Sequence, residues 1–252
     1  MKHSKIHHDY INNRSFLDNI ISNFDTKGDD FGNQKRNSLK LFDLNDEKLN
    51  VKSFKIPNIF NQIAYKFFRN SKAERSYEYA NKLLDLAVGT PKPIAFYEFS
   101  TSFLFGRSFY ISEHLDYDFT FRELTKDLNY PDHEKILRLF TRFTFELHEK
   151  GIHFLDHSPG NTLIKKMKEG YKFYLVDLNR MEFKTLTLEE RVKNFSRLTK
   201  HESIVKVMSD EYAKCLDKGY KEIFGIMWGN TQKFQKKFHR KKRLKKKLFI
   251  RK

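Results

Sequence analysis

The 252-residue sequence has little of several residue types, and each scarcity excludes a class of protein. A single cysteine, Cys215, excludes an internal disulfide framework and a cysteine-rich zinc site, and it favours a reducing compartment. No apolar run approaches the ~20 residues of a transmembrane helix, and the first residues lack the apolar core of a secretory signal. With 26 Phe, 12 Tyr and only 5 Pro, the composition also argues against disorder. We therefore expect a folded, cytoplasmic chain whose membrane contact, if it has one, is peripheral.

Positive charge is abundant but unevenly placed. The chain has 49 Lys and Arg against 32 Asp and Glu, a formal net charge of +17. Twelve of the basic residues lie between Lys233 and Lys252, where there are no acidic ones, so the remainder carries only +5. Phenylalanine and leucine are interleaved with this charge. Such a tail indicates an anionic partner, and a membrane surface fits better than nucleic acid because the aromatic spacing matches no nucleic-acid motif.

The first half of the chain has the patterns of strands with one helix. Residues 1–19 are polar and rich in His and Asn, and we expect a loose lead-in there. Strand-like signals begin at Ile20, and the clearest strands are predicted at 38–42, 49–54, 93–99 and 107–111. Ser71 and Glu74 form a capping box that opens a helix over 71–87. The predicted apolar stripe of this helix is Ala73, Tyr77, Ala80, Leu84 and Ala87. These elements predict an N-terminal lobe over residues 20–111.

The second half is mainly helical. The clearest helix spans 132–150 and ends at Gly151. A hairpin is expected over 162–176, and Thr187 with Glu190 opens helical segments that run to about residue 223. The predicted fold class is α+β with two lobes, a strand-rich N-lobe and a helical C-lobe over 112–227, followed by a basic tail over 228–252.

The segment with the strongest chemical signal runs from Gly151 to Asn161. Asp156 follows the clearest helix after a short turn, Asn161 comes five residues later, and Asp177 closes the following hairpin. This is the order of polar groups that phosphoryl transfer requires. One Asp accepts the proton of the attacking hydroxyl or orients it, while the Asn and the second Asp hold Mg²⁺ against the phosphates.

These residues resemble a known family. Asp156 to Asn161 matches the kinase catalytic-loop spacing, and Val176-Asp177 sits where the metal-binding Asp falls. The segment Asp-His-Ser-Pro-Gly-Asn-Thr-Leu-Ile, residues 156–164, is most similar to the lipopolysaccharide core kinases, which phosphorylate Kdo or heptose and have a protein-kinase-like fold. The similarity spans roughly residues 20–223, with softer matches in the N-lobe.

The resemblance implies ATP and Mg²⁺ as cofactors and assigns further site residues. Lys52 would bind the ATP phosphates, with Lys55 as the alternative. Glu78, or otherwise Glu74, would pair with that lysine from the helix over 71–87. We favour Glu78 because Glu74 already serves the capping box.

The resemblance also implies a nucleotide loop and a hinge. Gly28 and Gly32 bracket the candidate phosphate-covering turn, which departs from the Gly-x-Gly-x-x-Gly pattern. Its two acids, Asp29 and Asp30, would repel phosphates, although Lys35 and Arg36 just beyond could offset that repulsion. Glu113 would lie at the hinge and contact adenine through its backbone. A plain hairpin turn remains an equal interpretation for the glycines.

The departures from protein kinases narrow the function. Phe154 stands where protein kinases have a histidine, Leu178-Asn179 replaces Phe-Gly after Asp177, and only nine residues separate Asp177 from Thr187. These features favour a compact glycan or small-molecule kinase acting at the inner membrane on a glycolipid or sugar. The alternatives are a kinase of another small molecule or a protein, and a non-catalytic kinase-like module that binds an anionic membrane or nucleic acid. Nothing in the sequence indicates the oligomeric state.

Overall fold

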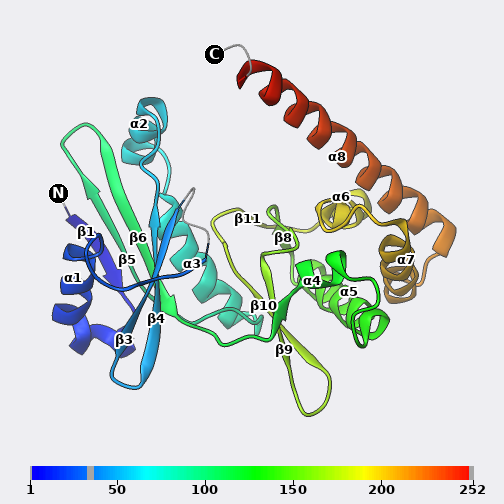
Figure 1. Cartoon of the computed structure of the whole chain (residues 1–252), viewed down its shortest axis with the longest axis horizontal. Helices are drawn as coiled ribbons and strands as arrows, with labels where there is room; N and C mark the ends of the chain where they lie inside the picture. The colour runs from blue at the N-terminus through cyan, green and yellow to red at the C-terminus, as the bar shows by residue number, and fades with distance from the viewer. Residues whose placement is uncertain (1, 33–36, 250–252) are drawn as a thin grey trace. The chain divides into compact units, whose positions relative to one another are not determined.

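The computed structural model describes residues 2–32 and 37–249, and the side chains up to residue 246. The chain divides into two compact units (Figure 1). The N-terminal unit is Met1–Asp116 together with Asp177–Asn179, and the C-terminal unit is Tyr117–Val176 together with Arg180–Lys252. The predicted fold class is confirmed, because the first unit is built on an antiparallel sheet and the second is mainly helical.

A six-stranded antiparallel sheet forms the N-terminal unit, in the order β1-β5-β6-β4-β3-β2. Its strands are β1 (Lys2–Ile6), β2 (Asp29–Asp30), β3 (Ser38–Leu44), β4 (Glu47–Phe54), β5 (Pro93–Ser100) and β6 (Phe105–Glu113). Its helices are η1 (His8–Asn13), α1 (Arg14–Ser22), α2 (Ile59–Phe67) and α3 (Lys72–Asp85). The four strands predicted most clearly are present as β3, β4, β5 and β6.

The N-terminal residues differ from the prediction of a loose lead-in. β1 pairs antiparallel with β5, from Lys2 opposite Phe99 to Ile6 opposite Ala95. α1 follows where a loose lead-in was expected up to residue 19 and strand signals from Ile20, and its Leu17, Ile20 and Ile21 are buried against the sheet. The spacing of these three residues at i, i+3 and i+4 is that of a helix face. The segment is therefore part of the unit's core.

α3 begins as predicted, with the Ser71 hydroxyl accepting a hydrogen bond from the Glu74 backbone N–H at 3.1 Å. Ala73, Tyr77 and Ala80 are buried as the pattern predicts. The next core position is Leu83, which is fully buried, whereas the predicted Leu84 is 39% exposed. The apolar stripe of α3 therefore drifts by one residue toward its end.

The C-terminal unit contains five α-helices, one 3-10 helix and short strands within the part of the chain that the structure describes. The strands are β7 (Phe119–Thr120), β8 (Ile152–Phe154), β9 (Thr162–Lys166), β10 (Tyr171–Leu175) and β11 (Met181–Phe183). The helices are α4 (Phe121–Lys126), α5 (His133–Glu149), α6 (Leu188–Lys193), η2 (Asn194–Arg197), α7 (Glu202–Leu216) and α8 (Tyr220–Phe249). The predicted helix over 132–150, the hairpin β9–β10 and the Thr187–Glu190 capping box are all present.

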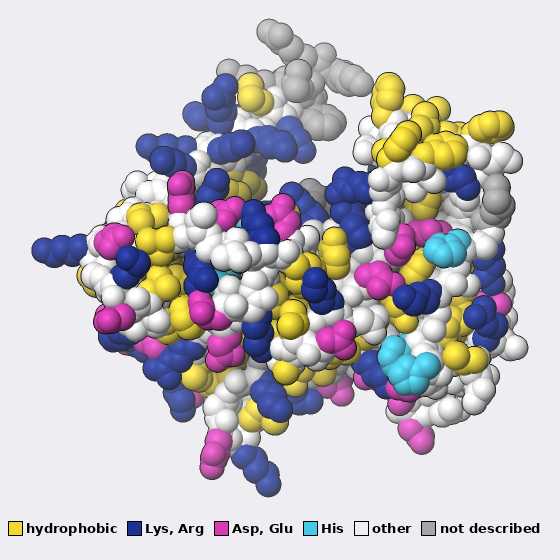
Figure 2. All heavy atoms as spheres, turned by 180° about the vertical axis from the view of Figure 1, so that it is seen from behind, with side chains coloured by type: hydrophobic (Ala, Val, Ile, Leu, Met, Phe, Trp, Pro, Cys, Tyr) yellow, Lys and Arg dark blue, Asp and Glu magenta, His cyan; other side chains and the backbone are white. Residues whose placement is uncertain are grey.

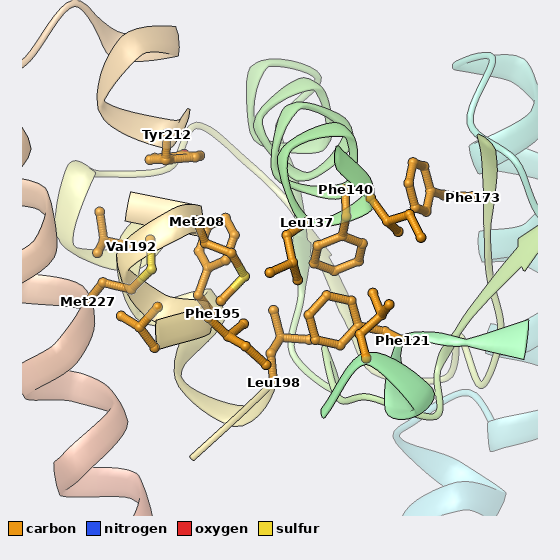
Figure 3. Close-up of a cluster of buried hydrophobic side chains, with 14 of the residues drawn as sticks. Phe121, Leu137, Phe140, Phe173, Val192, Phe195, Leu198, Met208, Tyr212 and Met227 are labelled. Atoms are coloured by element: carbon orange, nitrogen blue, oxygen red, sulfur yellow. The ribbon is translucent and has the colours of Figure 1, made fainter. Parts of the chain in front are cut away.

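The core of this unit lies where α5, α7 and α8 meet η2 (Figure 3). Phe140 from α5, Phe195 from η2 and Tyr212 from α7 are among its fully buried side chains. Their burial contributes about 1.5–3 kcal/mol for each large apolar side chain. This core fixes β8 and the loop after it, because Phe154 at the end of β8 is also fully buried.

The basic tail is the second half of α8. Ile223 and Met227 are buried in the core, and Thr231 has no exposed surface, so the helix is anchored well beyond residue 228. The described side chains from Lys236 to Lys246 are exposed. Within the residues that the structure covers, no helix combines the length and apolar character needed to cross a membrane.

Candidate active site

Lys52 and Asp177 form an ion pair within the N-terminal unit. Lys52 lies on β4 between Val51 and Ser53, whose side chains are buried on the opposite face. Its Nζ donates to Asp177 Oδ1 at 2.7 Å, and the lysine side chain is only 14% exposed. Lys55, the alternative, has an exposed side chain. Of the two lysines, Lys52 is therefore the one that meets a predicted metal ligand.

Asp177 is held in an unusual backbone conformation. Its φ is +60°, in the left-handed region that non-glycine residues rarely occupy. The buried Asn179 donates through Nδ2 to the same Oδ1 at 2.7 Å. Among the described residues, no hydrogen bond reaches Oδ2, and the side chain is 33% exposed. A carboxylate oxygen free in this way fits a hard cation such as Mg²⁺, which prefers oxygen ligands.

Asp156 and Asn161 lie in a compact loop of the C-terminal unit. Asn161 Nδ2 donates to the Asp156 backbone carbonyl at 2.9 Å. The Asn161 backbone N–H bonds the Ser158 carbonyl at 2.9 Å, and its own carbonyl accepts from Val176 N–H at 3.0 Å. With its amide nitrogen engaged inward, the amide oxygen of Asn161 is available as a ligand. The predicted base and the predicted amide ligand are thus fixed relative to one another.

Two arginines that the sequence did not single out lie at this loop. Arg197, at the end of η2, donates through Nη1 to Asp156 Oδ1 at 2.8 Å and to the Leu155 carbonyl at 3.0 Å. The Arg122 guanidinium occupies the space where a Cβ on Gly160 would be. Arg197 lies 41 residues after Asp156 in sequence, so no local spacing could have paired them. These two arginines, which come from outside the loop, therefore place positive charge beside it.

The two histidines near Asp156 differ in role. His157 is fully buried between Phe140, Phe154 and Phe195, and neither ring nitrogen has a hydrogen-bond partner among the described residues. Burial, with a smaller effect of His148, lowers the pKa of His157 to about 3. It is therefore a neutral core residue rather than a group that binds substrate. His153 lies 3.4 Å from Glu182 Oε2, on the neighbouring strand.

Glu78 is not the partner of Lys52 in this structure. Lys5 on β1 donates to Glu78 Oε1 at 2.8 Å instead. Glu74, the alternative, has its backbone N–H on Ser71, and burial raises the pKa of its carboxyl, with Glu98 adding to the effect. The expected pairing of Glu78 with Lys52 did not take β1 into account, because this strand was not predicted. A strand that joins the sheet edge supplies the cation that Glu78 meets.

Gly28 and Gly32 do not bracket a turn. The residues between them form β2, which pairs with β3. Gly28 has φ +81°, and a Cβ there would lie 2.5 Å from Phe42 Cζ, so any other residue would strain the backbone and displace the Phe42 ring. Gly32 has φ +68° with open space around it. Lys35 and Arg36 lie outside the described residues.

Glu113 ends β6, and its groups serve the N-terminal unit. Its carboxylate accepts a hydrogen bond from Tyr10 Oη at 2.9 Å, and its backbone N–H bonds the Lys92 carbonyl at 2.9 Å. The next backbone N–H, that of His114, bonds the Lys48 carbonyl at 2.7 Å. The Glu113 backbone N–H is therefore already engaged and is not available for the backbone contact with adenine that the resemblance implies.

Comparisons with known proteins bear on the fold and the family. The chain is similar to a solved structure described as WaaP in complex with acyl carrier protein, with a TM-score of 0.64 and 13% identity over 93% of this chain and 98% of that one. It is also similar to the PknI kinase domain of Mycobacterium tuberculosis, with a TM-score of 0.42 and 10% identity over 73% of this chain and 70% of that one. A comparison with curated proteins gave no match. The family model described as the lipopolysaccharide kinase (Kdo/WaaP) family matches residues 34–220. Because that match covers most of the chain, the protein belongs to the lipopolysaccharide kinase (Kdo/WaaP) family and is a kinase.

Proposed function

We propose that this kinase transfers the γ-phosphoryl group of ATP, with Mg²⁺, to a hydroxyl of Kdo or heptose in the lipopolysaccharide core. The observation that carries the proposal is the 2.7 Å ion pair between Lys52 and Asp177, which lie 125 residues apart in the sequence. A sparingly exposed lysine beside a carboxylate with one free oxygen supplies a cation for phosphate and a ligand for Mg²⁺. Family membership supports a sugar acceptor.

Asp156 is the proposed base. Its carboxylate would accept the proton of the attacking hydroxyl or orient that hydroxyl, while Arg197 holds it through the 2.8 Å ion pair. Asn161 and Asp177 would hold Mg²⁺, which neutralises phosphate charge when bound, and Lys52 would contact the phosphates. The chain's own contribution is positioning and preorganised charge rather than covalent chemistry.

The basic half of α8 is the proposed contact with the cytoplasmic face of the inner membrane. Its described side chains between Lys236 and Lys246 are exposed, and the helix is anchored by Met227 and Thr231 in the core. Each Lys or Arg near an anionic leaflet contributes about 1 kcal/mol to binding. A glycolipid acceptor held in the membrane makes such a contact useful.

Two measurements test this function separately. ATP with Mg²⁺ should raise the melting temperature of the wild type, and Asp177→Ala should abolish the shift. Asp156→Ala should keep the shift but lower transfer to the lipid A–core glycolipid by about 10²–10⁴-fold, since it removes only the base. Transfer by Asp156→Ala at the wild-type rate would refute the assignment of the base. No nucleotide shift in the wild type would refute ATP as the donor and favour a non-catalytic module.

A further inference from the structure

α2 turns its apolar face away from the protein. Ile59, Phe60, Ile63 and Phe67 fall within an arc of about 100° at ~100° per residue. Their exposed fractions are 54%, 80%, 41% and 57%. On an ordinary surface helix such a stripe faces the core. None of the residues of α2 is buried, so the helix contributes little to the core of its own unit.

The other side of α2 attaches it to the sheet. Lys66 Nζ donates to Ser100 Oγ at 3.0 Å, and the rings of Tyr65 and Phe105 lie 5.7 Å apart. These contacts tie the helix to the ends of β5 and β6. Tyr65 lies opposite the apolar stripe, and Lys66 lies at its edge, about 20° from Ile59 at ~100° per residue. Their contacts with the sheet therefore hold the stripe outward.

The exposed apolar surface continues beyond the helix. Phe68 follows α2 and is 84% exposed, and Phe103 in the β5–β6 turn is 76% exposed. Hydrophobic side chains gather over α2 and the neighbouring tips of β5 and β6 (Figure 2). We call this surface the α2 patch, formed by Ile59, Phe60, Ile63, Phe67, Phe68 and Phe103. Exposed apolar clusters of this kind mark interaction surfaces in soluble proteins.

The charge around the α2 patch identifies its partner. Residues 55–73 include four basic side chains and no acidic one: Lys55, Lys66, Arg69 and Lys72. Protruding Phe and Ile beside Lys and Arg are typical of helices that lie in the interface of an anionic membrane. Phe60, Phe68 and Phe103 are each more than three-quarters exposed, so each ring projects from the surface. Such projecting rings suit the fluid interior of a bilayer better than the shaped surface of a protein.

We propose that the α2 patch inserts into the interface of an anionic lipid bilayer, with the flanking lysines and Arg69 at the headgroups. This contact lies in the N-terminal unit and is separate from the basic half of α8. It differs in chemistry as well, because it is held by apolar burial and persists when salt screens charge. It does not depend on the catalytic assignment, since lipid binding is measured without ATP or an acceptor.

Vesicle binding of the full chain tests the α2 patch. The wild type should co-float with phosphatidylglycerol–phosphatidylcholine vesicles at about 0.5 M NaCl, where charge contacts are largely screened. Phe60→Ser with Phe68→Ser should lower this salt-resistant binding by about tenfold or more, because two large apolar groups leave the bilayer. The matched control is Leu84→Ser with Leu128→Ser, which changes exposed leucines outside the patch and should bind as the wild type does.

A fluorescent label locates the contact. Phe103→Cys in a Cys215→Ser background carries the label at a single thiol, since Cys215 is the chain's one cysteine. Its emission should shift to the blue on addition of vesicles, whereas a label at Leu128→Cys should not shift. Equal salt-resistant binding by the Phe60/Phe68 variant would overturn the proposal. A wild-type dimer in sedimentation that dissociates in this variant, with no blue shift at position 103, would show instead that the patch joins two copies of the chain.

Discussion

At the scale of single residues, Arg197 is the group whose role can be separated from folding. It reaches Asp156 Oδ1 and the Leu155 carbonyl, so it fixes the carboxylate rather than taking part in proton transfer. Arg197→Met should lower kcat by roughly 10²-fold, because small displacements of a reacting group are costly. The KM for ATP should stay the same, and Arg197→Lys should recover part of the rate. A change in ATP KM with kcat intact would contradict this positioning role.

The buried His157 predicts a loss of stability in acid. Its folded pKa of about 3 lies below the unfolded value of 6.5, so the unfolded chain takes up the proton first. The stabilisation is full above pH ~6.5 and falls as the pH drops below that value. From about pH 7.5 to about pH 5.5, His157 should remove about 1.4 kcal/mol from the free energy of unfolding. Urea unfolding of the wild type and His157→Leu checks this, and identical pH dependence in the two would refute it.

The sequence predicted best the residues that lie close together in the chain. Asp156 and Asn161 are five residues apart, and their loop is closed by the hydrogen bond between them. The family resemblance named Lys52 and Asp177 separately, for the phosphates and for the metal, and their contact across 125 residues of sequence was not predicted. Glu78 does not pair with Lys52 in the structure, because Lys5 on β1 binds it instead. The polar sequence of residues 1–19 gave no sign of that strand. Arg197 carried no local signal, since only the tertiary fold brings it to Asp156.

At the scale of elements, substitution of the two glycines that flank β2 tests whether they serve the fold or a nucleotide loop. Gly28→Ala should lower the free energy of unfolding by about 1–3 kcal/mol, because the added Cβ meets the Phe42 ring and the backbone has positive φ. Gly32→Ala meets only the backbone strain and should cost about 1 kcal/mol or less. Chemical denaturation measures both. A Gly28→Ala protein of wild-type stability with a raised KM for ATP would contradict the packing role.

Elements with strong periodicity or caps were predictable, and short amphipathic ones were not. α5 and the capped starts of α3 and α6 are present at the expected places. α1 was missed because only three of its residues enter the core, among polar neighbours. α2 was missed although Ile59, Ile63 and Phe67 have the i, i+4 and i+8 spacing of a helix face, and this spacing does not tell whether the face covers the core or points outward.

At the scale of the whole molecule, the excess of positive charge is a property of α8. Replacing three exposed lysines of its second half by glutamine should weaken binding to anionic vesicles at low salt by roughly 10²-fold. ATP binding should not change. The same replacement on the β9–β10 hairpin is the matched control and should have little effect. The residues are Lys236, Lys242 and Lys246 on α8, and Lys166, Lys168 and Lys172 on the hairpin. Equal loss from both sets would mean that net charge, not the helix, drives binding.

The most direct test of the central claim is mass spectrometry of the lipid A–core fraction from cells with the wild-type chain and with Asp156→Ala. One phosphate on a Kdo or heptose residue should be present with the wild type and missing with the variant, whose expression and melting temperature should stay the same. An identical phosphate pattern in the two fractions would contradict the assignment of a lipopolysaccharide core sugar as the acceptor.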